Sequence, residues 1–301
     1  MDINTYCWWS ICEVYEKEVK VKMDNSLLNG VKALVMGDDR ILASVIIGSC
    51  ARTENIADRY SDIDIIFVTN KPDDFIYSDY WLDTLGSFHI SFVEPTLFSG
   101  LERRILFDSG HDIDVIVLTE EQSTHLRNGE NGEIFERGYI VIKDTIGITQ
   151  DIGKNTIHSE KKGYILLSED EYINMINDFW FHVVWTIKKI QRGEVFIAKF
   201  CLDNYLMKIL LTMIENYETI NDKDVWYNGR FIESWAEEWI LEGLEKTYTR
   251  DSITSALISI MEIFSNLATT VAKLKSFIYP KETEHNARML FSRLISGEDY
   301  L

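Results

Sequence analysis

The sequence of 301 residues is poor in cysteine, proline and positive charge. Its four cysteines, Cys7, Cys12, Cys50 and Cys201, form no CxxC pair. Their scatter argues against a zinc site and a disulfide framework, and it favours a reducing cytoplasm. Acidic residues outnumber Lys and Arg by 49 to 30, which gives a net charge of −19. Such a field repels nucleic acid and would attract a cationic small molecule, although solubility alone explains the charge equally well.

Membrane and export signals are also absent from the pattern. No stretch of 18 apolar residues is free of charge, so we expect neither a membrane-spanning helix nor a membrane partner. The N-terminus, MDINTYCWWSICEVYEKEVK, has an acid at its second position and only a short apolar patch. It lacks the basic start and apolar run of a signal peptide, which again predicts a cytoplasmic protein. Nothing in the sequence predicts an oligomeric state.

The chain changes character near residue 160. Before it, short strand-like runs alternate with polar loops: ASVIIGS, DIDIIFVT, FHISFV, DIDVIVLT and YIVIKD. After it, apolar residues recur at steps of three and four, the period of a helix. We therefore predict an α+β protein with a β-containing domain at 1–160 and a helical domain at 161–301. The chain has only three prolines, and the loop around HSEKKG, residues 158–163, is the best linker candidate.

Helix boundaries can be predicted at several points. A helix at about 24–38 should precede the first strand. In the second half, Ser168 followed by Glu171 has the spacing of a capping box, and the helix that starts there should end at Gly193. Further helices are expected at about 195–217, at about 230–247 and after Asp251.

The segment YSDIDIIFVTN, residues 60–70, carries acids where a buried strand is expected. Residues two apart on a strand share a face, so Asp62 and Asp64 present two carboxylates side by side. Like charges this close are unfavourable unless a cation sits between them, and hard oxygen ligands suit Mg²⁺. Taken alone, the pair is also compatible with two exposed residues at a strand end.

Two further features accompany this pair. Gly48 and Ser49 directly follow an apolar run, where a glycine lets the backbone approach a phosphate and a hydroxyl can bind it. Asp112 and Asp114 repeat the paired acids ahead of another strand-like run. Three acids from two strands, Asp62, Asp64 and Asp114, have the pattern of a two-metal phosphoryl-transfer site. The combination is much more specific than its parts.

Gly48-Ser49, Asp62-x-Asp64 and the later Asp114 resemble the signature of the polymerase-β-type nucleotidyltransferases. The segments RILASVIIGSCAR, YSDIDIIFV, YWLDTLG, RRILFDSGHDIDVIVL, NDFWFHVVWTIKKIQRGE and LLTMIEN further resemble, in order and spacing, the aminoglycoside 6-adenylyltransferases that inactivate streptomycin. The resemblance covers about residues 25–295 and leaves residues 1–22 outside it. It implies a nucleotidyltransferase domain, with a mixed β-sheet and flanking helices, followed by a helical substrate-binding domain.

The resemblance implies transfer of AMP from ATP to a hydroxyl of an aminoglycoside, with streptomycin as the expected acceptor. Two Mg²⁺ ions would be held by Asp62, Asp64 and Asp114, which form the catalytic set. Gly48, Ser49 and Arg52 would bind the nucleotide. Asp114 could also accept the proton of the acceptor hydroxyl.

The sequence departs from the family pattern at three places. The family usually has an Arg directly after the Ser of the Gly-Ser turn, a place that Arg52 could take. It commonly has Tyr where this chain has Ile63, and Glu where this chain has Asp178. Asp178 lies on a predicted polar stripe of its helix, so it could bind the cationic acceptor or act as the base instead of Asp114. The same stripe could equally face solvent or a domain joint.

The sequence is also compatible with other functions. The acceptor could be a lincosamide or another small molecule, or a protein, although the large helical domain argues against a protein target. A non-catalytic nucleotide-binding protein could use the same scaffold, but the three intact acids weigh against it. Polymerisation of nucleic acid is disfavoured by the charge of −19.

Overall fold

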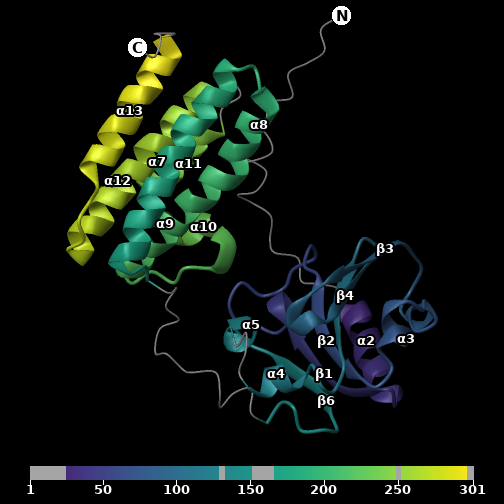
Figure 1. Ribbon diagram of the computed structural model, residues 1–301. Coiled ribbons are helices and arrows are strands. Elements are labelled where there is room, and N and C mark those ends of the chain that lie inside the picture. Colours follow the sequence, from purple (N-terminus) through teal and green to yellow (C-terminus); the bar gives the residue numbers. More distant parts are fainter. Residues whose placement is uncertain (1–24, 129–132, 151–165, 249–251, 297–301) are drawn as a thin grey trace, which may run out of the picture. The chain divides into compact units, whose positions relative to one another are not determined.

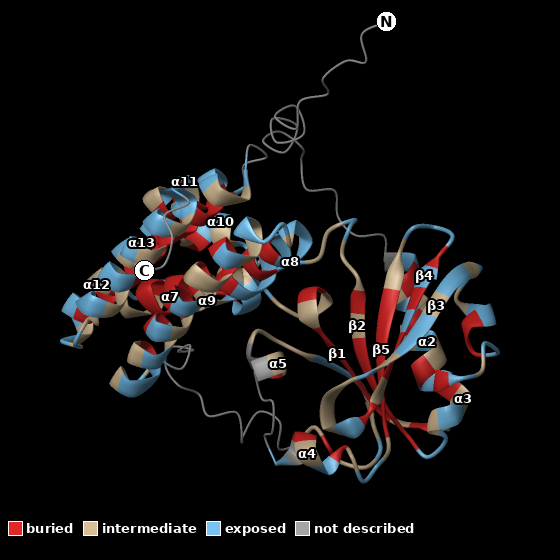
Figure 2. Ribbon diagram, turned by 45° about the horizontal axis from the view of Figure 1, so that its top comes forward, coloured by how far each residue is buried: buried red, intermediate tan, exposed pale blue. Residues whose placement is uncertain are grey.

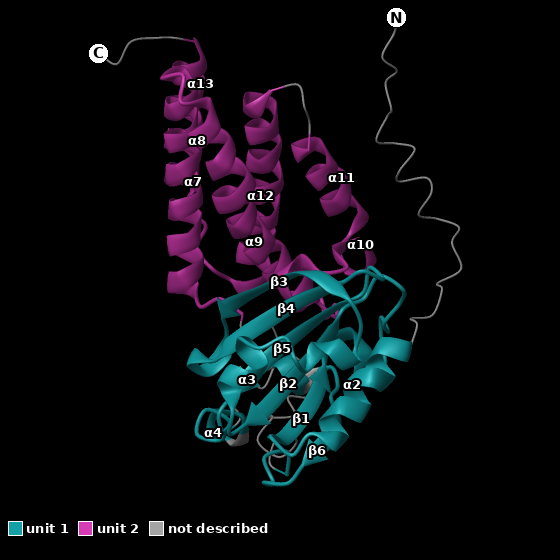
Figure 3. Cartoon of the chain, turned by 90° about the vertical axis from the view of Figure 1, so that its right-hand side faces the viewer, with its two compact units in different colours: residues 1–157 teal, residues 158–301 magenta. Residues whose placement is uncertain are grey.

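The computed structural model describes residues 25–128, 133–150, 166–248 and 252–296. It divides into two compact units, Met1–Ile157 and His158–Leu301 (Figure 3). All described strands belong to the first unit, and the described elements of the second are helical. The predicted α+β class, a mixed sheet followed by a helical bundle, is therefore confirmed. The predicted boundary at residue 160, the linker candidate HSEKKG and residues 1–22 lie outside the described residues.

One six-stranded sheet organises the first unit (Figure 1). Its strand order is β3-β4-β5-β2-β1-β6, in which β2 and β5 are parallel and all other neighbours are antiparallel. Each of the five predicted strand segments forms a strand, and β4 is an additional one. The strands are β1 Ile41–Ile47, β2 Ile63–Thr69, β3 Phe88–Pro95, β4 Leu101–Phe107, β5 Asp112–Leu118 and β6 Ile140–Asp144.

Both faces of the central strands are buried (Figure 2), which explains why β1, β2 and β5 read as continuous apolar runs. On one face, α2 (Asn25–Gly37) and α3 (Pro72–Ile76) pack against the strands. On the other, α4 (Thr124–Arg127) and α5 (Glu133–Glu136) contribute Leu126 and Phe135 to a smaller core. The helix predicted at about 24–38 is therefore α2.

The second unit buries its helices around a single apolar core. At its centre the rings of Phe179 and Phe264 stack with centroids 3.7 Å apart. The predicted capping box is present, since Ser168 Oγ accepts from the Glu171 amide and Glu171 Oε2 accepts from the Ser168 amide. The helices are α7 Glu169–Gln191, α8 Val195–Phe200, α9 Met207–Ile220, α10 Ile232–Trp235, α11 Glu238–Thr247, α12 Ile253–Lys275 and α13 Lys281–Ser296.

Two of the predicted helices differ in detail from the structure. The helix expected at 195–217 consists of α8 and α9 joined by a π-helical segment, Cys201–Leu206. The helix expected at 230–247 is broken at Ala236, which is extended, between α10 and α11. Neither interruption was predicted from the spacing of apolar residues.

By length and composition alone, α12 could cross a membrane. It carries the acidic Glu262, however, and 56% of its most apolar window is buried inside the structure. It contributes Leu257, Ile260, Phe264 and Leu267 to the core of the helical unit. A buried core helix passes the same test of hydropathy, so α12 is weak evidence for a membrane span.

Candidate active site

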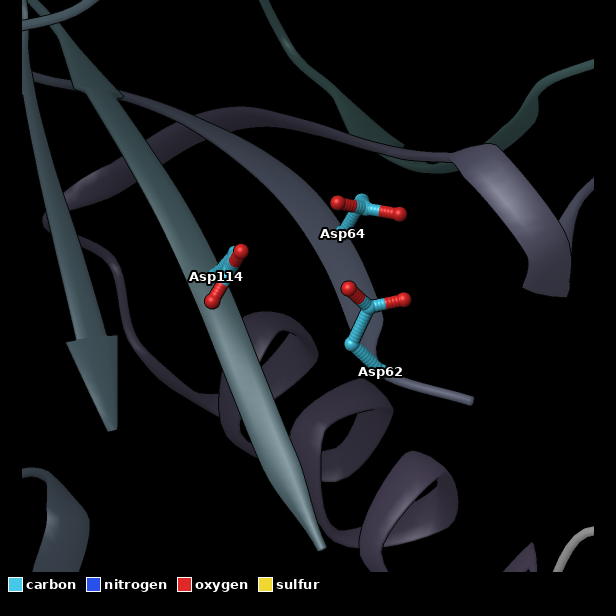
Figure 4. A group of neighbouring side chains, drawn as sticks. All are labelled: Asp62, Asp64 and Asp114. Carbon is cyan, nitrogen blue, oxygen red and sulfur yellow. The ribbon is translucent and has the colours of Figure 1, made fainter. Parts of the chain in front are cut away.

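Asp64 and Asp114 meet because β2 and β5 run parallel in matched register. Ile63 pairs with Ile113 and Asp64 pairs with Asp114 across these strands. Cross-strand partners point to the same face of a sheet, and Asp62, just before β2, is two residues from Asp64. Figure 4 shows the three aspartates as neighbours, with Asp62 and Asp64 beside one strand and Asp114 on the next.

The carboxylates of Asp62, Asp64 and Asp114 can each offer one oxygen such that all three oxygens lie within 4.8 Å of one another. Asp114 is buried, with 8% of its surface exposed, and the other two are half-buried. Burial raises the pKa of Asp114 to about 6, against the lowering effect of Arg104, and the nearby carboxylates of Glu102 and Asp62 raise it further. The folded chain thus concentrates negative charge at a site that is partly shielded from solvent.

A tight turn at Gly48–Cys50 borders this cluster on the side of β1. Gly48 has a φ of +66°, and a Cβ placed on it would lie 2.0 Å from Oδ2 of Asp64, so only glycine fits. Ser49 is buried, and its hydroxyl and the Cys50 thiol both approach the Asp62 carbonyl oxygen at 3.4 Å. The turn therefore lies against the backbone of Asp62 and the carboxylate of Asp64.

The other predicted nucleotide-binding residue, Arg52, lies four residues beyond Gly48. Its Nε donates to the carbonyl oxygen of Asn55 at 2.6 Å, so this loop holds part of the guanidinium. The sequence also paired Asp112 with Asp114, yet only Asp114 belongs to the group of converging oxygens. Asp112 is the first residue of β5 and pairs with Leu106. Burial, with a contribution from Asp62, raises its pKa as well.

A cation beside Asp114 was not anticipated from the sequence. Arg104 on β4 pairs directly with Asp114, and its Nε lies 3.4 Å from Oδ2 of that residue. The same Nε is 3.0 Å from Glu102 Oε1 and 2.9 Å from Glu94 Oε1. Glu102 in turn accepts a hydrogen bond from the hydroxyl of Thr96. The available signal was the spacing of Leu101, Ile105 and Phe107 in LERRILF, a period-two pattern that Arg103 interrupts.

Asp178 belongs to the second unit, on α7. Both of its carboxylate oxygens accept from the hydroxyl of Tyr205, at 2.9 and 3.2 Å. The Nδ1 of His182, one turn along the helix, is 2.6 Å from Oδ1 of Asp178, and the His182 and Tyr205 rings are 4.2 Å apart. Tyr205 lies in the π-helical segment, an irregularity that often occurs at functional sites. Asp178 is thus a half-buried carboxylate among aromatic rings.

Comparison with known protein families matches residues 21–294 to the family described as streptomycin adenylyltransferase. The chain belongs to this family. It is 20% identical to the aminoglycoside 6-adenylyltransferase of Staphylococcus aureus over 279 residues, which cover 86% of this chain and 94% of the relative. Over 267 residues it is also 20% identical to the enzyme of the same name in Bacillus subtilis (strain 168), with coverage of 83% and 90%.

A solved aminoglycoside 6-adenyltransferase from Bacillus subtilis is similar over 90% of this chain and 96% of its own, with 16% identity and a TM-score of 0.43. Membership in the streptomycin adenylyltransferase family makes the protein a nucleotidyltransferase, with ATP as the expected co-substrate. The three converging carboxylates fit the divalent metal that this enzyme class typically uses, because they supply hard oxygen ligands within 4.8 Å of one another.

Proposed function

We propose that the protein transfers AMP from ATP to a hydroxyl group of an aminoglycoside, and that streptomycin is the acceptor. One structural observation supports this most strongly: the parallel register of β2 and β5, which brings Asp62, Asp64 and Asp114 within 4.8 Å. Family membership supports the reaction type, and the names of the two relatives support the acceptor class. The net charge of −19 favours a cationic acceptor.

Asp62, Asp64 and Asp114 would hold two Mg²⁺ ions, which when bound supply positive charge for the phosphate oxygens. Without such cations the three carboxylates repel one another and would also repel ATP. Gly48 lets the backbone come close to a phosphate beside Asp64, and the Ser49 and Arg52 side chains are the proposed further phosphate contacts. This arrangement would position the triphosphate at the β1 side of the acids.

The proposed reaction is a displacement at the α-phosphorus of ATP. An acceptor hydroxyl oxygen forms a bond to that phosphorus while the bond to the oxygen that bridges the α- and β-phosphorus breaks, and pyrophosphate leaves with that electron pair. The hydroxyl proton passes to a carboxylate. Asp114 is the proposed acceptor of the proton, because its carboxylate belongs to the cluster at which the hydroxyl would attack. Asp178 is the alternative base or a ligand for the acceptor's positive charge.

The proposed setting of this reaction is the cytoplasm, where ATP is available and where scattered cysteines without a CxxC pair suit a reducing environment. Cys50 and Cys201, the two cysteines within the described residues, form no disulfide. An antibiotic that enters the cell would meet the enzyme there.

Mass spectrometry of streptomycin after incubation with the protein, ATP and Mg²⁺ tests the proposal. We expect the drug to gain one adenylate, with one pyrophosphate released for each transfer. A lincosamide in a parallel reaction should remain unmodified. Modification of the lincosamide alone would assign a different acceptor, and no nucleotide turnover with a broad panel of drugs would favour a non-catalytic binding protein.

Two variants separate the site from its surroundings. Asp114→Asn should reduce transfer by at least about 100-fold, because it removes an anionic ligand and the proposed base. Asp112→Asn removes the same charge two residues away on the same strand, outside the group of converging oxygens, and should retain transfer within about 10-fold. Equal losses in the two variants would contradict the assigned roles.

A further inference from the structure

Beside the acid cluster, on the face that carries Asp64 and Asp114, the sheet has a region whose side chains are mostly exposed. We call it the β3–β4 face; its six residues are Ile90, Phe92, Glu94, Glu102, Arg104 and Leu106. They form three cross-strand pairs: Ile90 with Leu106, Phe92 with Arg104, and Glu94 with Glu102. The alternate residues of β4, Arg103, Ile105 and Phe107, are buried toward the opposite face. The β3–β4 face therefore follows directly from the period of two in these strands.

Large apolar side chains on the β3–β4 face lie open to solvent. Phe92 is 51% exposed, Ile90 58% and Leu106 39%. In the same sheet, the helical cover formed with Leu126 and Phe135 packs on residues of β1, β2 and β5 instead. An exposed aromatic ring beside polar groups is a common platform for a sugar or cyclitol ring, whose faces are apolar and whose edges are polar.

The β3–β4 face and the Gly48 turn lie on opposite sides of the acid cluster. Along the sheet order, the Gly48 turn follows β1, on one side of Asp64, whereas Arg104 adjoins Asp114 from β4 on the other side. In an in-line displacement, the attacking and leaving oxygens stand on opposite sides of the phosphorus. If the pyrophosphate portion of ATP lies toward the Gly48 turn, the attacking hydroxyl comes from the side of β4 and β3.

The charges of the β3–β4 face suit a cation. Glu94 and Glu102 carry two negative charges, and Arg104 supplies one positive charge, leaving one negative charge before Asp114 is counted. Arg104 is 44% exposed in its side chain and Glu94 is 42% exposed, so a ligand can reach both. Glu102 is buried and tied to Thr96, which makes Glu94 the accessible carboxylate.

We propose that the β3–β4 face is the platform for the acceptor, a small polyhydroxylated cation. Glu94 pairs with an ammonium or guanidinium group of the acceptor, and Phe92 lies under one of its rings. Arg104 competes with the acceptor for Glu94 and thereby sets how tightly a cation is bound. This inference rests on the proposed function, and it deepens it by assigning the residues that determine acceptor specificity.

Two neighbouring substitutions should change acceptor affinity in opposite directions. Glu94→Gln removes the accessible carboxylate and should raise the KM for streptomycin by about 2- to 5-fold, the range of a half-exposed ion pair, with kcat within about 2-fold. Arg104→Met removes the competing cation and should tighten streptomycin binding, measured by calorimetry, by a similar factor. Phe92→Ala should raise the KM for streptomycin and leave the KM for ATP unchanged.

The matched control is Glu121→Gln. Glu121 is an exposed glutamate of the same unit beyond the far end of β5, so this variant makes the same change in net charge without touching the β3–β4 face. It should leave the KM for streptomycin unchanged. Arg104→Gln, which keeps a polar side chain, serves as a second variant if Arg104→Met unfolds, and it should also tighten binding.

The outcomes separate the inference from the function beneath it. If the wild-type enzyme adenylylates streptomycin but Glu94→Gln behaves like Glu121→Gln, the platform assignment is overturned and the proposed function stands. Weaker streptomycin binding in both Arg104 variants would likewise overturn the platform assignment. It would show that Arg104 stabilises the folded structure and does not compete with the acceptor for Glu94. Absence of transfer by the wild-type enzyme overturns the proposed function and this inference together.

Discussion

Asp64 and Asp114 are direct partners across two parallel strands, and the chain buries Asp114 at this contact instead of exposing it. The arrangement is unfavourable for the metal-free protein, because burial and neighbouring carboxylates disfavour the charged form of Asp114. Stability sacrificed at one point of a fold is typical of functional sites.

Asp114→Asn should stabilise the metal-free first unit at pH 7. The pKa of Asp114 is raised from 3.8 to about 6 in the folded chain, so its favourable contribution is complete below about pH 4 and is lost as the pH rises through 6. A shift of about two units corresponds to at most about 3 kcal/mol. Hydrogen exchange of peptides from β2 and β5 should show slower opening in the variant at pH 7 and little difference at pH 4.

Addition of Mg²⁺ with ATP should reverse the order, since the wild-type site gains a ligand that the variant lacks. Faster exchange in Asp114→Asn than in the wild type at pH 7 without metal would show that the charge of Asp114 is already compensated within the protein.

Gly48→Ala should inactivate the enzyme through Asp64. The added Cβ would lie 2.0 Å from the Asp64 carboxylate, which must then move, and the φ of +66° adds strain. We expect kcat/KM to fall by at least about 100-fold. Gly110→Ala is the matched control: its φ is +84°, and a Cβ there meets nothing within 4 Å. It has the backbone strain without the collision, so its activity should stay near that of the wild type.

Asp178→Asn tests whether Asp178 takes part in acceptor recognition. If Asp178 binds the acceptor's positive charge, the variant should raise the KM for streptomycin by about 2- to 5-fold and leave the KM for ATP unchanged. Asp203→Asn removes a carboxylate that is paired with Lys199 in the same unit and should have no such effect. A large fall in kcat with an unchanged KM would instead assign Asp178 as the base.

Tyr205→Phe refines that test. It removes the hydroxyl that donates to both oxygens of Asp178 and retains the ring next to His182. Because the hydroxyl orients the carboxylate, the change in KM should have the same direction as in Asp178→Asn and be smaller.

Gly243 in α11 is a packing requirement. A Cβ on Gly243 would lie 2.6 Å from Cγ1 and 2.8 Å from Cδ1 of Ile263 in α12. Gly243→Ala should therefore destabilise the protein by about 1–2 kcal/mol, the usual effect of overpacking, despite the better helix propensity of alanine. In an Ile263→Ala background the same substitution should stabilise by about 0.5–1 kcal/mol. Urea unfolding of the four variants measures this coupling; strictly additive effects would contradict it.

The sequence predicts that Asp62 and Asp64 share a face because that signal is local, whereas their approach to Asp114 depends on the register between β2 and β5. Period-two spacing places Asp62 and Asp64 on one face. The apolar run after Asp64 predicts β2, and the apolar run after Asp114 predicts β5. The glycine of the Gly48 turn was also visible, but its contact with the Asp64 carboxylate depends on how β1 and β2 pair. Contacts across strands are set by register, which the spacing along one strand does not specify.

Two elements, β4 and α13, were not predicted from the sequence, because β4 contains a buried charge and α13 has few buried apolar residues. β4 escaped prediction because Arg103, on its apolar phase, is buried and bound to the Ser78 carbonyl and to Asp79. With β4 unrecognised, Arg104 could not be placed beside Asp114. α13 was missed because Ala287 and Phe291 are its buried apolar residues, too few for a clear helical stripe.

Asp62, Asp64 and Asp114 are proposed to hold a divalent cation jointly. Calorimetric titration of Mn²⁺, in the presence of an ATP analogue that cannot be cleaved between its α- and β-phosphorus, measures this binding. Asn substitution of each of the three should weaken binding at least about 10-fold, whereas Asp112→Asn should bind within about 3-fold of the wild type. Wild-type affinity in Asp64→Asn and Asp114→Asn would contradict the claim.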